Sequence, residues 1–402
     1  MNKKPKVMFS NFKNNWKIFS FYNLANVFQS GGTPSTKEPT FWSGTIPWIQ
    51  SSDIQKDILF GVKPQKFISE EGLQNSSAKL ISKNSIAIVT RVGVGKLAII
   101  DQDYATSQDF LSLSDFNGDT QFIVYSIYRM LQKESTQLQG TSIKGITKED
   151  LLSKKVSLPE IDEQSAIGSL FRTLDDLLAS YKDNLANYQS LKATMLSKMF
   201  PKAGQTVPEI RLDGFEGEWE VVSLGTLIEN YDEIISGASG FPIATSSRKG
   251  LYLQNDYFEG GRTGIDLTLD FHRVPMGYVT YRHMSDDSIF KFNKNNFETD
   301  VLVSKEYPVF ISNDSSDIDF LLYHLNNSRL FLRFSTMQKL GGTRVRLYYK
   351  NLITYKLAVP TLKEQQAIGA YFSNLDNLIA AHQEKISQLE TLKKKLLQDM
   401  FI

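Results

Sequence analysis

Few residues in this sequence have the types and spacing that catalysis needs. A Gly-Lys pair occurs in VGVGKL at 92–97, but the earlier glycine and the following Ser or Thr of a phosphate-binding P-loop are missing. The four histidines, His272, His283, His324 and His382, do not have the spacing of metal ligands. The G-x-S-x-G, H-E-x-x-H and dinucleotide-binding motifs do not occur. These features favour a protein that binds a partner over one that catalyses a reaction.

Two long segments carry basic residues and lack acidic ones. No Asp or Glu occurs between Gly72 and Ile100, or between Leu321 and Lys363. Both segments also contain aromatic, hydroxyl and glycine residues, a composition that fits a surface for phosphate groups. The alternative is a solvated face whose counter-charges come from elsewhere in the fold. The net charge of +1 does not decide between the two.

The segment GGTPSTKEPTFWSGTIPWIQSSDI at 31–54 combines rigid turns with short polar side chains. Its prolines restrict the backbone, so the side chains beside them are displayed in fixed directions. We expect Trp42 and Trp48 to form a buried packing corner. The residues from Gln50 to Asp53 supply short hydrogen-bonding groups that suit the edges of bases.

The chain contains one segment twice, half a chain apart. Residues 156–200 align without a gap on residues 357–401 at an offset of 201, with 16 of 45 positions identical. The beginnings of the halves also correspond, with Trp16 opposite Trp219. Residues 30–110 and 233–320, by contrast, show no convincing similarity to each other. A shared frame with different contents predicts a molecule that recognises two different things.

Each copy of the repeat predicts a long helix with a heptad seam. Apolar residues recur in steps of three and four from Ile167 to Met199, and from Ile368 to Met400 in the same phase. Lys192 and Lys393 interrupt the seams at equivalent places, which tends to fix register. A helix over 161–199 would be roughly 58 Å long and would need a partner for its stripe. We expect the two helices to pair antiparallel; the alternative is that each packs on its own half.

The variable regions predict strands and short helices. Residues 84–100 indicate two strands joined by a turn at Gly93 and Gly95, and residues 277–292 and 301–312 indicate further strands. Short helices are expected at 120–133 and 317–334. The predicted fold is therefore α+β, with two globular recognition domains in a pseudo-two-fold arrangement, separated by two long antiparallel coiled-coil helices. The predicted boundaries are 1–157 for the first recognition domain, 158–200 for the first helix, 201–207 for a linker, 208–358 for the second recognition domain and 359–402 for the second helix.

The composition fits a folded protein of a reducing cytoplasm. The chain has 402 residues and no cysteine, which excludes disulfides and thiolate metal sites. No apolar run approaches the 18 or so residues that span a membrane. The basic N-terminus is not followed by an apolar stretch, so a signal peptide is not expected.

These features together resemble the specificity subunit of Type I restriction–modification systems. The resemblance covers essentially the whole chain. It rests on the segment at 31–54, on two copies of Pro-x-x-x-Glu-Gln-x-Ala-Ile-Gly, and on VPEIRLDGFEGEWE at 207–220. The second variable region carries no comparable motif.

The resemblance implies a division of labour between this chain and its partners. Two target recognition domains would read the halves of a split duplex DNA target, with the paired helices as spacer. Two modification subunits would carry S-adenosylmethionine and methylate adenine, and two restriction subunits would use ATP and Mg. The chain itself would hold no cofactor, metal or catalytic residue, and would have no membrane contact. The alternatives are a coiled-coil scaffold without a DNA role and a self-contained enzyme, which would need cofactor motifs.

The candidate site residues fall into two groups. The candidate DNA contacts are Thr33, Ser35, Gln50, Ser51, Ser52, Asp53, Arg91 and Lys96 in the first half, and Arg248, Lys249, Arg282, Arg344, Arg346 and Lys350 in the second. The candidate subunit and coiled-coil contacts are Glu163, Gln164, Phe171, Leu174, Leu178 and Leu185, with Glu364, Gln365, Phe372, Leu375, Ile379 and Ile386 in the second copy.

Overall fold

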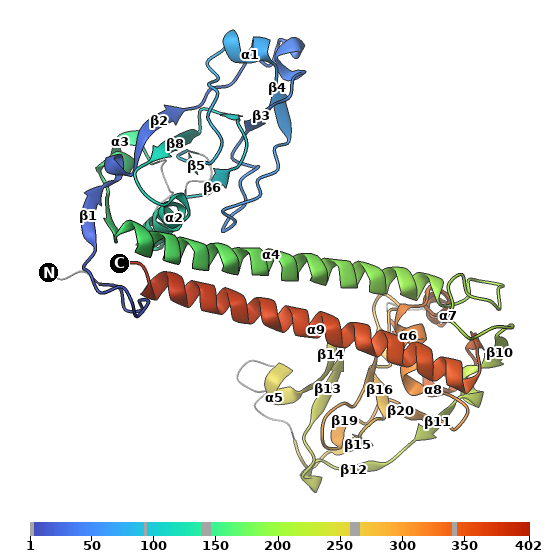
Figure 1. Cartoon of the computed structure of the whole chain (residues 1–402). Coiled ribbons are helices and arrows are strands. Elements are labelled where there is room, and N and C mark those ends of the chain that lie inside the picture. Colours follow the sequence, from blue (N-terminus) through green and yellow to red (C-terminus); the bar gives the residue numbers. More distant parts are fainter. Residues whose placement is uncertain (1–3, 92–94, 138–145, 258–265, 340–343) are drawn as a thin grey trace. The chain divides into compact units, whose positions relative to one another are not determined.

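A computed structural model describes residues 4–91, 95–137, 146–257, 266–339 and 344–402 (Figure 1). The chain forms two compact units. Unit 1 comprises Met1–Lys182 and Glu384–Ile402, and unit 2 comprises Asp183–Gln383. The long helices are α4 (Ile161–Lys198) and α9 (Leu362–Asp399), so each unit contains one part of both.

Unit 1 is built on a four-stranded antiparallel sheet. Its strands are, in order, β2 (Ala25–Ser30), β8 (Phe110–Phe116), β5 (Ser85–Val89) and β6 (Leu97–Ile100). Along β5, Ile86 and Ile88 enter one hydrophobic cluster while Ala87 and Val89 enter another, because successive side chains of a strand point to opposite faces. The hairpin predicted over 84–100 is thus confirmed as β5 and β6, although Gly93 lies outside the described residues.

A smaller mixed sheet displays the segment at 31–54. Its order is β4 (Lys66–Ile68), β3 (Ile46–Ile49) and β7 (Ala105–Thr106), with β3 parallel to β7. The predicted tryptophan corner is confirmed in its packing, since the rings of Trp42 and Trp48 meet edge to face at 5.0 Å. Trp48 is buried as predicted, whereas Trp42 is half-buried. Two short helices flank this sheet, η2 (Pro39–Trp42) and α1 (Glu70–Gln74).

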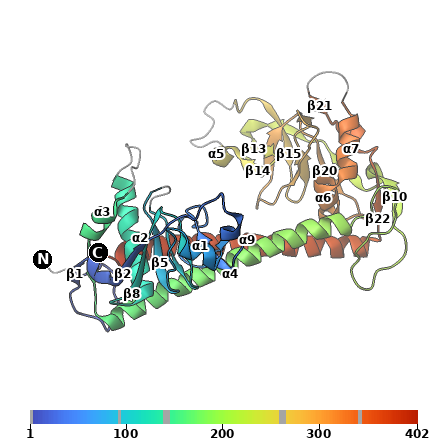
Figure 2. The same cartoon turned by 90° about the horizontal axis from the view of Figure 1, so that it is seen from above.

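The helix α2 (Thr120–Gln137) connects the sheet of unit 1 to the long helices (Figures 1 and 2). Its residues Phe122 and Tyr125 are fully buried, and the Tyr125 ring lies 5.1 Å from that of Phe171 on α4. The remaining elements close the unit where α4 begins. They are β1 (Lys17–Ser20), paired antiparallel with β9 (Lys155–Leu158), η1 (Phe21–Leu24) and α3 (Lys148–Ser153).

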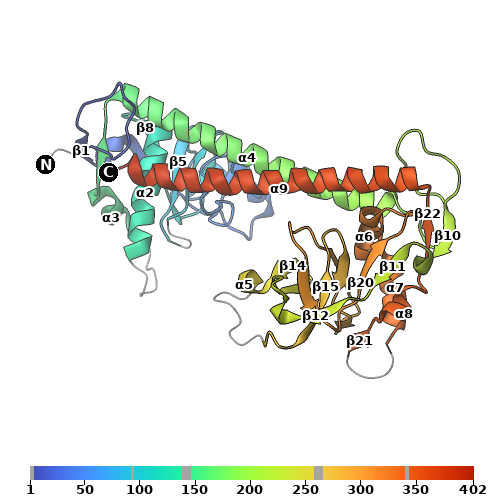
Figure 3. The same cartoon turned by 90° about the horizontal axis from the view of Figure 1, so that it is seen from below.

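Unit 2 repeats this frame. Its four-stranded antiparallel sheet has the order β11 (Ile228–Tyr231), β20 (Val309–Ser312), β16 (Val279–Tyr281) and β18 (Phe292–Lys294), matching β2-β8-β5-β6 strand for strand. The closing pair is β10 (Glu220–Ser223) with β22 (Lys356–Val359), and α6 (Ile318–Asn327) occupies the place of α2 (Figure 3). The variable regions therefore share a sheet topology that their sequences do not reveal.

Of the other elements of unit 2, η3 (Leu224–Thr226) and α8 (Tyr349–Leu352) hold the chain positions of η1 and α3, and the rest differ from those of unit 1. The helix predicted at 317–334 is wrong as one helix, because Ser328 has extended backbone and its side chain caps a second helix. One further sheet contains β12 (Ile234–Ser236), β15 (Asp270–Val274) and β19 (Val301–Ser304). The remaining strands form the hairpin of β13 (Ala244–Ser247) with β14 (Gly250–Leu253) and the pair of β17 (Met284–Ser285) with β21 (Val345–Arg346). The remaining short helices are α5 (Gln254–Tyr257), α7 (Arg329–Met337) and η4 (Gly237–Ser239).

Within each unit, the segments of α4 and α9 pair antiparallel, as predicted. In unit 1, Asp175 is ion-paired with Lys393 and Lys182 with Glu390, so numbers on α9 fall as those on α4 rise. In unit 2, Tyr188 packs on His382 and Lys192 is ion-paired with Asp376, again in opposite directions. The predicted seam residues lie along these contacts. Phe171, Leu174, Leu178, Phe372 and Leu375 are buried, and Leu185, Ile379 and Ile386 are half-buried.

The repeated Met-Phe at the end of each helix fills an aromatic core. In unit 1, Phe401 lies 5.2 Å from Phe122 and 5.5 Å from Phe171. In unit 2, Phe200 lies 5.4 Å from Phe320 and contacts Phe372 in the equivalent way. Each unit is therefore completed by the C-terminal end of the helix that starts in the other unit.

Candidate nucleic-acid interface

The repeated glutamines fasten each recognition domain to a long helix. Gln164 accepts a hydrogen bond from the Asp119 backbone N–H at 3.1 Å and donates one to the Pro159 carbonyl at 2.9 Å. Asp119 in turn caps α2 by accepting from the Phe122 N–H at 2.8 Å. In unit 2, Gln365 makes the same contacts to Asp317 and Pro360 at 3.0 Å each. The first turn of the long helix is thereby tied to the cap of the recognition-domain helix.

The repeated glutamates are also buried, with different partners. Glu163 is 2% exposed and accepts from the Trp16 indole N–H at 3.3 Å; its burial raises its pKa. Glu364 is 1% exposed and binds the Arg211 guanidinium at 2.8 and 2.7 Å. Each Glu-Gln pair is enclosed within its own unit, and its predicted contact with a second subunit or the coiled-coil seam stays a prediction.

In unit 1, several of the predicted contacts gather at one end of β3. Parallel pairing of β3 and β7 lets the Ser107 N–H bond the Ile49 carbonyl, so Gln50 follows beside Ser107. The Thr33 hydroxyl donates to Gln108 at 2.5 Å. The Lys96 ammonium donates to the Ser51 carbonyl at 3.2 Å. The cluster presents hydroxyl, amide and ammonium groups from four separate chain segments.

Two glycines allow this convergence. The Gly32 N–H bonds the Thr106 carbonyl at 2.9 Å, and the Gly32 carbonyl accepts from the Trp48 indole at 3.0 Å. A Cβ added at Gly31 would lie 2.1 Å from the Thr106 hydroxyl oxygen, and one at Gly32 would lie 2.2 Å from the Ser77 carbonyl oxygen. Only glycine permits so close an approach, which places Thr33 beside β7.

The other first-half candidates stand apart from this cluster. Asp53 is buried and its carboxylate accepts from the Gln50 N–H at 3.0 Å, so it closes a turn, and its predicted DNA contact stays a prediction. Ser35 bonds the Lys37 N–H within its own loop. Ser52 and Arg91 are exposed, and residues 92–94, which follow Arg91, lie outside the described part of the chain.

In unit 2, four predicted contacts line one surface pocket of about 400 Å³: Arg248, Lys249, Arg282 and Arg344. The pocket lies between the β13–β14 hairpin, the segment after β17 and the start of β21. Arg346 and Lys350 are exposed but do not line it. A basic pocket of this size at the end of a hairpin suits a nucleic-acid edge or a phosphate.

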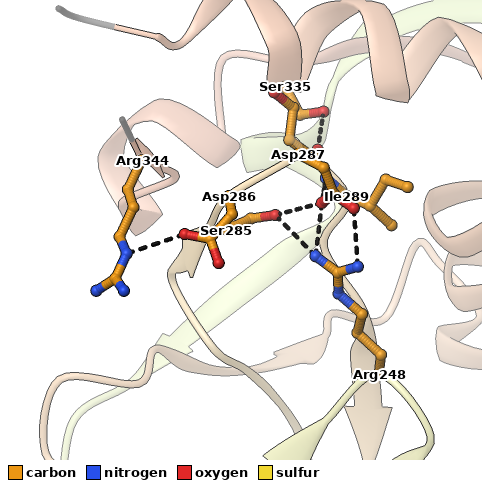
Figure 4. Close-up of polar contacts among 8 residues, drawn as sticks. Arg248, Ser285, Asp286, Asp287, Ile289, Ser335 and Arg344 are labelled. Carbon is orange, nitrogen blue, oxygen red and sulfur yellow. Dashed lines mark hydrogen bonds and ion pairs between the residues drawn. The ribbon is translucent and has the colours of Figure 1, made fainter. Parts of the chain in front are cut away.

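Paired carboxylates orient two of the pocket arginines (Figure 4). Arg248 binds both oxygens of Asp287 through its terminal amino groups at 2.8 and 2.6 Å. Arg344 binds Asp286 through Nε at 2.9 Å. Burial by itself would raise the pKa of Asp287, but hydrogen bonds from Arg248, Ser285 and the Ile289 N–H hold that pKa below its usual range.

Comparison with known proteins decides the family. The model of the Type I restriction modification DNA specificity domain matches residues 13–187 and 249–391, which is most of the chain. The chain belongs to the family of Type I restriction–modification DNA specificity domains. Both matched regions include a Glu-Gln pair. Between them they cover the β3 cluster and the part of the unit 2 pocket lining from Lys249 onward, whereas Arg248 lies just outside the second region.

Relatives of the specificity-domain family resemble parts or most of the chain. The EcoR124I/EcoR124II specificity subunit of Escherichia coli is 31% identical over 166 residues, covering 39% of this chain and 40% of that one. The MjaIX specificity subunit of Methanocaldococcus jannaschii is 23% identical over 227 residues, 53% of this chain and 52% of that one. These matches therefore span about half or less of the length of either relative. A crystal structure of an S subunit from M. genitalium has a TM-score of 0.61 at 14% identity, covering 99% of both chains, which shows the fold.

Sequence reasoning missed several residues of this specificity-domain chain. Asp286 and Asp287 carry the wrong charge for a search based on basic residues, yet they orient the pocket arginines. Lys291 lines the same pocket and is half-buried; burial, with Lys192 nearby, lowers its pKa. Lys291 comes directly before strand β18 in the sequence, and a search of the residues that flank predicted strands could have found it.

Among the described residues, the acidic, histidine and cysteine side chains form no group of three or more that could hold a metal ion. Over the same described ranges, the helices lack any stretch with the length and apolarity needed to cross a membrane.

Proposed function

We propose that this chain is the DNA sequence-specificity subunit of a Type I restriction–modification complex. Each unit reads one half of a split duplex target. The observation that carries the proposal is that the two units share a frame and differ in their polar surfaces. The β2-β8-β5-β6 and β11-β20-β16-β18 sheets have the same strand order, and Gln164 and Gln365 make the same capping contacts. Such a molecule can present two different half-sites to identical enzymes.

The polar surfaces suit two kinds of DNA contact. Lys249 and Arg282 in the unit 2 pocket are exposed cations, which favour phosphate oxygens and add to affinity for every sequence. Gln50 and Thr33 in unit 1 are short hydrogen-bonding groups on fixed backbone, which favour base edges. The proposed DNA-binding surfaces therefore combine phosphate contacts, which do not depend on sequence, with base contacts, which do.

Exposed leucines on the long helices support docking of two identical partners. With Phe171 and Phe372 as heptad position a, Lys182 and Glu390 are both at position e, and they pair at 2.7 Å. The residues at heptad position e of α4 and α9 therefore meet on one side of unit 1, and the residues at position g of both helices lie on the other side. Leu177 and Leu392 occupy those g positions with 43% and 44% exposure. An exposed apolar stripe of this kind indicates an interaction surface.

The same stripe recurs in unit 2. Leu191 and Leu378 occupy its g positions and are 37% and 42% exposed. Because the two pairs come from equivalent positions of the repeat, they fit two copies of the same protein. We assign them to two modification subunits, which would carry S-adenosylmethionine and methylate an adenine flipped out of the duplex. Two restriction subunits would supply ATP- and Mg-dependent cleavage, and this chain would supply no catalytic group.

Co-expression with candidate modification subunits tests the DNA role. The complex should place N6-methyladenine in a bipartite motif with an unspecified gap, detected by sequencing of methylated genomic DNA. Formation of a stable complex that binds duplex DNA at low salt no better than the modification subunits alone would favour the scaffold alternative. Methyl transfer by the purified chain without partners would instead favour the self-contained enzyme.

Leucine variants test the docking surface. L177S with L392S should remove one modification subunit from the complex, and L191S with L378S should remove the other, as measured by native mass spectrometry. The matched control is K182S with E390S, which alters the residues at position e of unit 1 and should keep both subunits. Retention of two subunits in both leucine variants would exclude this surface.

A further inference from the structure

The two arginines of the unit 2 pocket are equally exposed but differently occupied. The side chains of Arg248 and Arg344 are each 56% exposed, and each is ion-paired with an aspartate. A guanidinium has five N–H donors arranged as forks, and the donors that a carboxylate already holds decide which remain for a ligand. The comparison of the two pairs therefore indicates which arginine can bind another group.

Arg248 has both terminal amino groups engaged by Asp287. The Asp287 Oδ1 atom also accepts from the Ser285 hydroxyl at 2.8 Å and from the Ile289 N–H at 3.1 Å, so this carboxylate is firmly placed. The Ser335 hydroxyl is buried and donates to the Ser288 carbonyl at 2.8 Å, which anchors the same loop. Arg248 thus links the β13–β14 hairpin to the loop, and its fork is occupied.

Arg344 is held at one atom only. Its Nε donates to Asp286, and its terminal amino groups make no hydrogen bond to any side chain or carbonyl within the described ranges. The contact follows the strand register: Ser285 pairs with Val345 across β17 and β21, so Arg344 lies opposite Asp286. Asp286 is 77% exposed, so the pair is weak and leaves the guanidinium accessible. Backbone pairing and one hydrogen bond therefore aim a free fork outward.

The surrounding charge favours a base edge over a phosphate. The other pocket cations, Lys249, Arg282 and Lys291, suit phosphates. At Arg344 itself the two ion pairs balance in charge, and the Asp286 carboxylate lies next to the free fork. A phosphate docked there would face that carboxylate, with repulsion between like charges. The O6 and N7 acceptors of guanine are neutral and match the two terminal amino groups of an arginine in the major groove.

We propose that Arg344 reads a guanine in the half-site of unit 2, with Asp286 as its positioning residue. The Arg248–Asp287 pair holds the pocket wall and does not read a base. This inference rests on the DNA-reading function proposed above, and it adds the residue and the base that it selects.

Methylation mapping of the complex of full-length chain and modification subunits tests the assignment. R344A should reduce discrimination at one guanine of one half-site by about 5- to 150-fold, the range for loss of a bidentate contact. R344K keeps the charge and loses the fork, so it should lose the same discrimination and retain general affinity. D286N should weaken discrimination at that guanine and raise binding to unrelated duplex DNA.

The control is R248A, which removes the same charge at the same exposure. It leaves Asp287 uncompensated, so it should weaken binding to all sequences without changing the motif. A half-site for unit 2 without a G·C pair, or an R344A motif identical to that of the unchanged chain, would overturn the assignment. An unchanged chain whose complex methylates no defined sequence would instead overturn the proposed function.

Discussion

Lys393 of α9 is ion-paired with Asp175 of α4, and its repeat partner Lys192 is ion-paired with Asp376 in the same way. Each aspartate also accepts a tyrosine hydroxyl from the recognition-domain helix, at 2.6 Å from Tyr125 and 2.7 Å from Tyr323. The lysine that interrupts each seam and its aspartate partner therefore connect three helices of the unit. The same contacts fix the register of the two long helices and the position of the recognition-domain helix on them.

Replacement of the seam lysines should destabilise the two units unequally. Lys393 and Asp175 are only 10% and 17% exposed, so K393M should cost about 3 kcal/mol, since it leaves a buried carboxylate without its cation. Lys192 and Asp376 are 24% and 42% exposed, so K192M should cost about 1 kcal/mol. Urea unfolding of the purified chain measures both. The exposed pair Lys182–Glu390 is the control, and K182M should change stability by less than about 0.5 kcal/mol.

Loss of the repeated glutamine should be costly even though its neighbour tolerates change. Q365L leaves the Asp317 N–H and the Pro360 carbonyl without their partner in a buried place, at about 1–3 kcal/mol for each group. Q366L alters the next residue, which is exposed, and should have an effect within about 0.5 kcal/mol. Thermal unfolding of both variants checks this. Equal melting temperatures would show that the glutamine contacts do not fasten the domain.

An alanine in place of the repeated helix glycine should destabilise unit 1 despite its better helix propensity. Propensity alone favours alanine over glycine by about 1 kcal/mol. A Cβ on Gly168, however, would lie 2.6 Å from an Asp119 carboxylate oxygen and 2.8 Å from the Phe122 nitrogen. Overpacking of this kind costs about 1–3 kcal/mol, so we expect a net loss for G168A in denaturant unfolding. A gain in stability would mean that α2 can move away from α4 without cost.

Stability should fall below neutral pH because of His324. This imidazole is buried, with Nε2 2.8 Å from the Tyr355 hydroxyl, and burial lowers its pKa to about 4. The unfolded state therefore binds a proton at higher pH than the folded state does. The stability is present in full above the unfolded pKa of about 6.5 and is lost as pH falls toward 4, by up to about 3 kcal/mol.

The contribution of His324 is measured as the difference in unfolding free energy between the unchanged chain and a His324 variant, because many carboxylates titrate in the same pH range. Unfolding free energies of the unchanged chain and H324L between pH 7 and pH 4 should converge as pH falls. Parallel curves would show that His324 does not change its protonation between the folded and unfolded states.

The sequence predicted the elements that depend on periodicity. The repeat and its heptad phase identified α4 and α9 and the lysines that set their register, and the glycine turn identified the β5–β6 hairpin. The aspartates that bind those lysines were not predicted. They lie at position e, one step off the seam, and only the antiparallel pairing brings them to the lysines.

Only part of the candidate site was predicted, again because the rest depends on contacts between distant segments. Charge identified Arg248 and Arg344, but whether a guanidinium is free depends on which acidic residue faces it across the sheet. Burial likewise separates Asp53, which closes a turn, from Gln50 beside it. Both distinctions arise from tertiary contacts between segments that are distant in sequence, and local pattern does not contain them.

The separability of the two half-sites tests the account most directly. Residues 30–110 would be exchanged for the equivalent segment of another specificity subunit, and the methylated motif would be mapped for the original and exchanged chains with the same modification subunits. The shared frame and separate polar surfaces predict a change in one half of the motif, with the other half retained. A motif altered in both halves, or in neither, would contradict the account.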